Sequence, residues 1–146
     1  MTRAENPLEL SDQYDAILCT HWLQKVHRYD VKEVLEHWHE HLNDDGQLYI
    51  IVTDLKWIAD TIHQEWDATP NVMAALFGDH DDPHRCAFTM GMLREVLEGT
   101  GFITQEARTG PFTIGQGEGT ILARQLFVRA EKAKLNPPES ALEEAE

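Results

Sequence analysis

The sequence has 146 residues, of which 42% are hydrophobic and 26% are charged, as is ordinary for a single globular domain. Its 26 acidic and 12 basic residues give a formal net charge of −14, which argues against nucleic acid and anionic membranes as partners, and no apolar run approaches the roughly 20 residues of a membrane helix. The two cysteines, Cys19 and Cys86, are too few for a disulfide framework, so we expect a cytoplasmic protein.

The chain is expected to begin with an N-terminal arm, residues 1–12, because this segment is polar and contains a proline. The next segment, residues 14–19 (YDAILC), is a short apolar run that predicts a buried strand. Three residues, Thr20, His21 and Trp22, follow directly at its carboxyl end.

A helix is predicted over residues 31–42. Its apolar side chains recur at i, i+3, i+4, i+7 and i+11 from Val31, so they form one helical face. Asp30 stands three residues before Glu33, a spacing typical of a helix cap and its partner.

A central strand is predicted from the segment 46–54, GQLYIIVTD. Residues 43–46 supply a turn, and the unbroken, largely β-branched run that follows is typical of a strand buried on both faces of a mostly parallel sheet. Thr53 and Asp54 lie at its carboxyl end. Because a helical pattern precedes and follows it, the chain alternates strand and helix, which indicates an α/β fold.

Helical patterns continue beyond this strand. Residues 55–66 repeat the apolar spacing and leave Trp57 on the opposite face. A region rich in Asp and His then extends to Arg85, with at most a short helix at residues 72–77.

The last part of the domain is predicted to hold a capped helix and a pair of strands. Thr89 stands where it can cap a helix that closes at Gly99. Residues 102–108 and 121–129 are interpreted as neighbouring strands, joined by the glycine-rich segment 110–119.

The C-terminal tail, residues 135–146, contains two prolines and four acidic residues without a basic one. Such a composition predicts disorder. The domain itself is therefore expected to span residues 13–134.

Four segments together carry a resemblance. They read YDAILCTHWLQKV, LEHWHEHLNDDGQLYIIVTDL, HRCAFTMGMLREVLEGTGF and ARQLFVRAEK, within residues 10–132. In this order they resemble the second half of a class I (Rossmann-like) S-adenosylmethionine-dependent methyltransferase. The resemblance implies a partial methyltransferase sheet of about four strands, the last antiparallel, with flanking helices.

The resemblance also sets an expectation for the cofactor. In that family a glycine-rich turn and an acid hold S-adenosylmethionine, and both precede the part that this chain resembles. The one GxGxG, Gly115, Gly117 and Gly119, opens no helix and is interpreted as a hairpin. The family often has Glu and His where this chain has Gln24 and Lys25. We therefore expect weak or no binding of S-adenosylmethionine and no methylation by the chain alone.

The candidate ligand crevice lies beyond the carboxyl ends of the strands, where open α/β sheets bind ligands. The residues expected to line it are Thr20, His21, Trp22, Thr53, Asp54 and, by the resemblance, His84. His21 is a candidate general base, since an unperturbed imidazole titrates near neutral pH. The alternative is that these residues only end strands and begin loops, and no catalytic residue is assigned.

The histidines of the first predicted helix are candidate ligands for a metal ion. Glu33, His37 and His41 are spaced by four and share one face, as zinc ligands sometimes do. A structural zinc needs about four ligands and an ordered second shell, which the sequence does not indicate. We therefore expect solvated polar groups and no metal site, a packing role for His39, and a solvated loop at residues 80–84.

Three functions stay open: an enzyme completed by a second chain or by self-association, a small-molecule-binding protein, and an interaction module. The strand at residues 14–19 is expected to have a free edge, because its neighbour in the resembling family belongs to the missing half. An unpaired apolar edge favours association, so we expect a homodimer through this strand. The alternative is that residues 1–12 fold back over the edge.

Overall fold

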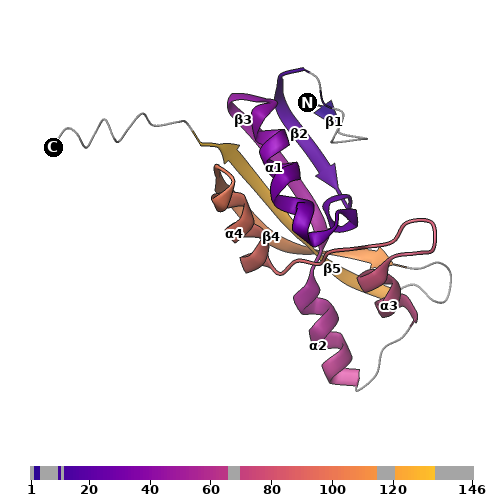
Figure 1. Ribbon diagram of the computed structural model, residues 1–146. Helices are drawn as coiled ribbons and strands as arrows, with labels where there is room; N and C mark the ends of the chain where they lie inside the picture. The colour runs from indigo at the N-terminus through magenta and orange to yellow at the C-terminus, as the bar shows by residue number, and fades with distance from the viewer. Residues whose placement is uncertain (1, 4–9, 11, 66–69, 115–120, 134–146) are drawn as a thin grey trace.

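The computed structural model describes residues 2–3, 10, 12–65, 70–114 and 121–133. Its centre is one mixed sheet (Figure 1) of β1 (Thr2–Arg3), β2 (Tyr14–Thr20), β3 (Leu42–Thr53), β4 (Phe102–Ile114) and β5 (Ile121–Lys132). The strand order is β1-β2-β3-β5-β4. The first three strands run parallel, and β5 is antiparallel to both β3 and β4. The predicted α/β class, with four long strands and an antiparallel last strand, is confirmed.

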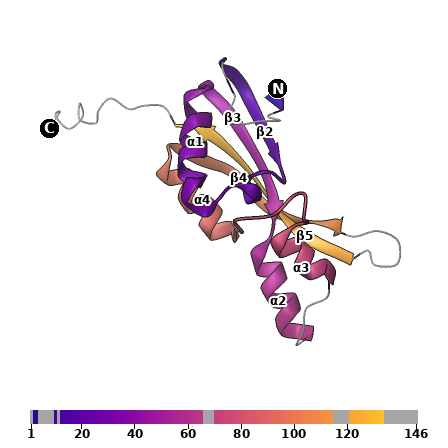
Figure 2. The same ribbon diagram turned by 45° about the vertical axis from the view of Figure 1, so that its right-hand side comes forward.

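Within the described residues, four α-helices and two short 3-10 helices connect the strands. They are η2 (Leu23–Lys25), η3 (Arg28–Asp30), α1 (Val31–Glu40), α2 (Leu55–Glu65), α3 (Pro70–Phe77) and α4 (Met90–Gly99). Figures 1 and 2 show α1 and α4 over the same face of the sheet, while α2 and α3 lie beyond the carboxyl end of β3. In the described part of the chain, no helix has the length and apolar character needed to cross a membrane.

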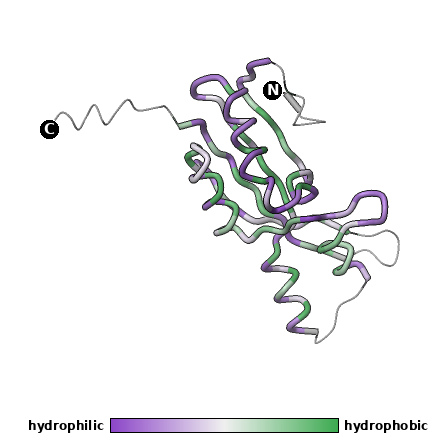
Figure 3. The backbone as a smooth tube through the Cα atoms, in the orientation of Figure 1, coloured by the Kyte–Doolittle hydropathy of each residue, from purple (hydrophilic) through white to green (hydrophobic). Residues whose placement is uncertain are grey.

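The main core lies between the sheet and the pair α1 and α4. Its fully buried side chains include Ile17, Trp38, Ile50, Leu97 and Val128. Figure 3 shows the apolar central strands beside helices in which polar and apolar residues alternate. On the other face of β3, Tyr49 and Ile51 are only half-buried. The prediction of a strand buried on both faces is therefore wrong, because the described helices α1 and α4 cover one face.

A second, smaller core joins α2, α3 and the end of β4. Ile58, Val72 and Ala75 are its buried residues, and Trp57 and Ile114 are among the partly buried residues packed against them. Trp57, which lies off the apolar stripe of α2, is thus covered by this cluster.

The structure departs from the prediction at both ends of α1. Asp30 occupies the N-cap position, but its side chain makes no capping hydrogen bond, so the predicted capping partnership with Glu33 is wrong. The helix ends at Glu40, two residues earlier than predicted, because Leu42 already pairs with Tyr14 of β2.

The predicted turn at residues 43–46 lies inside β3 as an irregularity in its pairing. The pairing passes from Leu42 opposite Tyr14 to Gln47 opposite Ala16. Asp45 has a left-handed φ of 68° within this irregularity. The structure assigns residues 42–53 as one strand, so the predicted start of the strand at residue 46 is wrong.

Two further differences concern the ends of strands. β4 extends to Ile114, six residues past its predicted end, and pairs there with Ile121. Thr2 and Arg3 pair with β2 at Ile17 and Leu18, as in the alternative in which N-terminal residues fold back over this edge. The GxGxG motif, most of the arm and the tail at 135–146 lie outside the described residues.

Candidate functional site

A pocket of about 240 Å³ opens at the carboxyl end of β3. It is bounded by the loop after β2, by η2, by α3 with the loop that follows it, and by the end of β4. The side chains that shape it include His21, Gln24, Thr53, His84 and Phe112. Three of these, His21, Thr53 and His84, belong to the predicted crevice, and the structure brings them to one cavity.

Gln24 organises the floor of this pocket. The side chain is buried, and its Oε1 accepts a hydrogen bond of 3.0 Å from the backbone N–H of Thr53. This contact fixes the amide so that Nε2 faces Nε2 of His84 at 3.2 Å. His84 Nδ1 lies 3.3 Å from the carbonyl oxygen of Ala75, which can only accept. The network therefore selects the His84 tautomer with its proton on Nδ1, and Gln24 donates to Nε2.

His21 presents a second imidazole to the pocket. Its Nε2 lies 3.0 Å from the side-chain oxygen of Gln125, so Nε2–H donates and Nδ1 carries the lone pair. The ring packs on Phe112 with centroids 4.9 Å apart. Burial lowers the pKa of His21 below its ordinary value of 6.5, the hydrogen bond to Gln125 raises it, and the positive charge of Lys25 lowers it further. At neutral pH the pocket therefore holds a neutral imidazole that can accept a proton.

The rim of the pocket is tied down by charge and by one glycine. Asp82, which lines the pocket, forms an ion pair of 3.0 Å from its Oδ1 to Lys25 Nζ. Gly78, with a left-handed φ of 74°, lets the chain turn between α3 and His84. The polar side chains of the loop at residues 80–84 therefore do not converge on a common site. His80 and Asp81 are exposed, whereas His84 turns into the pocket.

The other three residues of the predicted crevice lie elsewhere. Thr20 is exposed at the end of β2. Trp22 packs against Trp38, with ring centroids 6.2 Å apart, at the edge of the main core. Asp54 is buried, and its Oδ1 accepts a hydrogen bond of 3.0 Å from the backbone N–H of Lys56 at the start of α2.

Sequence reasoning did not select Gln24 or Phe112 for the pocket. Phe112 lay beyond the predicted end of its strand, so its position opposite His21 was hidden. Gln24 was noted only as a departure from the family pattern. The position of Gln24, four residues after β2, was a clue that it could reach the pocket. Its hydrogen-bond partners Thr53 and His84, however, are 29 and 60 residues away in the chain, so no local pattern links them to it.

The sequence was compared with the models of known protein families. Residues 1–107 match the family model of a methyltransferase domain, which covers most of the chain. The chain belongs to this methyltransferase domain family. No curated protein matches this methyltransferase domain in sequence.

Several solved structures share the fold. An S-adenosylmethionine-dependent methyltransferase from Methanosarcina mazei has a TM-score of 0.63 at 14% identity, over 90% of this chain and 66% of that chain. A candidate methyltransferase from Bacillus halodurans has a TM-score of 0.58 at 11% identity, over 86% and 68%. The 1,6-didemethyltoxoflavin-N1-methyltransferase of Burkholderia thailandensis, with bound 1,6-didemethyltoxoflavin and S-adenosylhomocysteine, has a TM-score of 0.57 at 18% identity, over 88% and 48%. The methyltransferase domain thus spans about half to two thirds of these chains, and the likeness shows the fold.

Two acids of this methyltransferase domain, Asp54 and Asp82, are not free to hold the ribose of S-adenosylmethionine. A ribose diol needs a carboxylate that is free to accept from both hydroxyls. Asp54, at the carboxyl end of β3, is buried and caps α2. Asp82, at the pocket rim, is paired with Lys25. These acids are committed to the protein.

Proposed function

We propose that this methyltransferase-family chain binds a small molecule in the pocket of His21, Gln24 and His84, and that it does not bind S-adenosylmethionine by itself. The observation that carries the proposal is the hydrogen-bonded series from the Thr53 backbone through Gln24 and His84 to Ala75. A hydrogen-bonded network in which each polar group has a partner holds side chains in place before a ligand arrives.

Pocket size supports a small ligand. The volume of about 240 Å³ lies below the range of roughly 300 to 1,000 Å³ that is usual for drug-sized ligands. The lining combines the apolar ring of Phe112 with the imidazole of His21, whose Nδ1 is left with the lone pair by the hydrogen bond at Nε2. A ligand with a flat apolar part and a hydrogen-bond donor suits these two groups.

In this proposal the chain does not catalyse methylation by itself. Methyl transfer depends mainly on holding donor and acceptor in line, and many such sites need no strong base. His21 would contribute proton acceptance toward a bound acceptor group. The donor half of the reaction would come from a second chain, and the whole enzyme's activity belongs to that assembly.

Calorimetry tests the cofactor part of the proposal. S-Adenosylmethionine and S-adenosylhomocysteine are titrated into the isolated chain, and we expect no saturable heat at micromolar protein. Unpaired ribose hydroxyls would lose on the order of 1 kcal/mol or more each. A dissociation constant in the low micromolar range would contradict the proposal and restore a self-sufficient enzyme.

A thermal-shift screen tests the pocket. Small aromatic amines and alcohols are screened against the wild type, since a ligand of the folded state raises the melting temperature. Ala74→Leu narrows the pocket from α3, and Met73→Leu on the same helix is the matched control, because Met73 is 39% exposed and does not line the cavity. Hits should vanish with Ala74→Leu and persist with Met73→Leu. Hits that persist in both would place the ligand elsewhere.

A second candidate function is an interaction module that forms a homodimer through β2. The side of β2 away from β3 pairs with Thr2 and Arg3 at Ile17 and Leu18. Within the described residues, the other positions of β2 have no strand on that side. An incompletely paired edge supports association through the backbone.

A further inference from the structure

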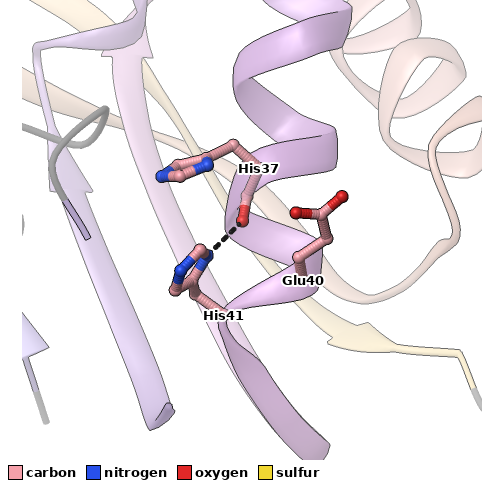
Figure 4. A group of neighbouring side chains, drawn as sticks. All are labelled: His37, Glu40 and His41. Atoms are coloured by element: carbon pink, nitrogen blue, oxygen red, sulfur yellow. Dashed lines mark hydrogen bonds between the residues drawn. The ribbon is translucent and has the colours of Figure 1, made fainter. Parts of the chain in front are cut away.

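The outer face of α1 gathers three metal-ligating side chains at its carboxyl end. His37, Glu40 and His41 stand at i, i+3 and i+4, so they share one turn of helix. One donor atom from each lies within 4.8 Å of the others. Figure 4 shows the two imidazole rings one above the other, with the Glu40 side chain leaving the same turn. The sequence had suggested Glu33 as the carboxylate, whereas the structure brings in Glu40.

The ring of His41 is held in a defined tautomer. Its Nδ1 lies 3.0 Å from the backbone carbonyl oxygen of His37, as the dashed line in Figure 4 marks. A carbonyl oxygen only accepts, so the proton is on Nδ1 and the lone pair is on Nε2. Metal-binding histidines usually donate their second ring nitrogen to a backbone carbonyl or a carboxylate in this way. This contact is the outer-shell support that the sequence did not indicate.

His37 supplies a second observation. Its Nε2 is buried from solvent and has no hydrogen-bond partner in the described part of the chain. The ring lies against the His41 ring, with centroids 4.5 Å apart. Buried polar nitrogens in native proteins almost always have a partner, so one without a protein partner points to a ligand or a water.

Carboxylates surround this position. Glu33, Glu36 and Glu40 line, together with His37, a hollow of about 380 Å³. No ion pair joins any of the three carboxylates to a lysine or arginine among the described residues. The chain as a whole carries a net charge of −14, so the local field favours a cation.

We propose that His37, Glu40 and His41 bind one divalent first-row transition-metal ion, with Zn²⁺ as the reference case. Imidazole and carboxylate together suit Zn²⁺, Ni²⁺ or Cu²⁺, whereas Mg²⁺ and Ca²⁺ prefer oxygen alone. Bonds of about 2.0 to 2.2 Å place two ligands of a tetrahedral zinc roughly 3.3 Å apart. Side chains at a helix surface close the remaining gap by rotation, and water or Glu36 completes the coordination.

The proposed metal has a structural role. His41 directly precedes Leu42, the first residue of β3, so a metal held across His37 and His41 fastens the end of α1 to the start of the strand. The pocket lies at the opposite end of β3. A ligand that binds only the folded state raises its stability, so the metal should stabilise the chain without entering the pocket.

Calorimetry with zinc chloride tests the proposal, using chain without a histidine tag in chelator-free buffer. We expect one ion per chain with a micromolar dissociation constant, and a higher melting temperature with zinc. His41→Gln and Glu40→Gln should each weaken binding by about tenfold or more, since they remove a ligand. His80→Gln is the matched control and should bind as the wild type does, because His80 is fully exposed.

Circular dichroism of each variant without metal separates a lost ligand from a lost fold. Equal weakening by His80→Gln and His41→Gln would overturn the proposal, as would the absence of saturable zinc binding by the folded wild type. If His41→Gln fails to fold, Glu40→Gln decides, because the Glu40 side chain forms no hydrogen bond that the described fold requires.

Discussion

Gly78 shows how the pocket depends on a single backbone position. Its φ of 74° is left-handed, and a Cβ there would collide with the Asp82 carbonyl oxygen and lie 2.9 Å from the backbone nitrogen of His84. We expect Gly78→Ala to lower the free energy of unfolding by about 1 to 3 kcal/mol and to abolish hits in the ligand screen. Urea denaturation monitored by circular dichroism measures the first effect.

Gly91→Ala is the matched control for Gly78→Ala. Gly91 is the second residue of α4, and a Cβ there meets nothing within 4 Å. Alanine favours a helix interior over glycine, so this variant should gain about 0.5 to 1 kcal/mol. If both variants lose stability equally, strain at Gly78 is not the cause.

His21 predicts a dependence of stability on pH. Burial, its largest influence, lowers the pKa of His21 in the folded chain below the ordinary value of 6.5. At a pH between the pKa of His21 in the folded chain and its pKa in the unfolded chain, the unfolded state binds more protons than the folded state. The free energy of unfolding therefore falls as pH decreases from about 6.5. Burial also lowers the pKa of His39, which adds to the same trend.

His21→Asn tests this contribution. Asparagine tolerates the left-handed φ of 51° at this position and does not titrate. Urea denaturation at pH 7.5 and at pH 5.5 should show a smaller loss of stability in this variant than in the wild type. His80→Asn, at an exposed site, should keep the wild-type loss. An unchanged loss in His21→Asn would contradict the expected role.

At the scale of elements, the caps of α4 and α1 offer a matched pair. Thr89 Oγ1 accepts a hydrogen bond of 3.2 Å from the backbone N–H of Met92, whereas Asp30 makes no such bond. Removing a bonded cap costs about 1 kcal/mol, so Thr89→Ala should lower the free energy of unfolding by that amount. Asp30→Ala should cost less, since only its charge near the helix start is lost. Equal costs in urea denaturation would refute the difference.

Elements were predictable where a pattern is local. Apolar spacing located α1 and α2, and Thr89 was recognised as the cap of α4. The end of α1 was missed because it depends on Leu42 pairing with Tyr14 across the sheet. Likewise, the topology of parallel strands placed His21 and Thr53 near one another. The hydrogen bond between Gln24 and His84 was beyond reach, because no local pattern encodes which loops meet.

At the scale of the whole molecule, the edge of β2 is where we propose that two copies of the chain associate. We expect two copies to pair β2 antiparallel about a two-fold axis. The competing outcome is a monomer in which the N-terminal residues occupy the edge, as Thr2 and Arg3 do at Ile17 and Leu18. Light scattering after gel filtration decides, since a mass near 16.7 kDa at micromolar concentration rules out the stable dimer.

Two variants probe the edge itself. Ile17→Pro removes a ladder donor and should split or unfold a dimer. Ala16→Lys leaves the backbone donors intact and places a charge on a half-exposed position of β2, so it should split the dimer while the chain stays folded. A dimer that survives Ala16→Lys in a folded state would place the interface elsewhere.

The division of the interior into two cores has a consequence for motion. The small cluster of Ile58, Val72 and Ala75 buries far fewer side chains than the main core, so α2 and α3 should open in a subglobal event of lower free energy than complete unfolding. The amides of these helices would then exchange with deuterium sooner than those of β3 and β5. Ala75 also lines the pocket, opposite Gln24 and Thr53. A bound molecule would contact both α3, whose amides exchange fast, and β3, whose amides exchange slowly. We therefore expect binding to slow deuterium exchange in α3 without changing the fold.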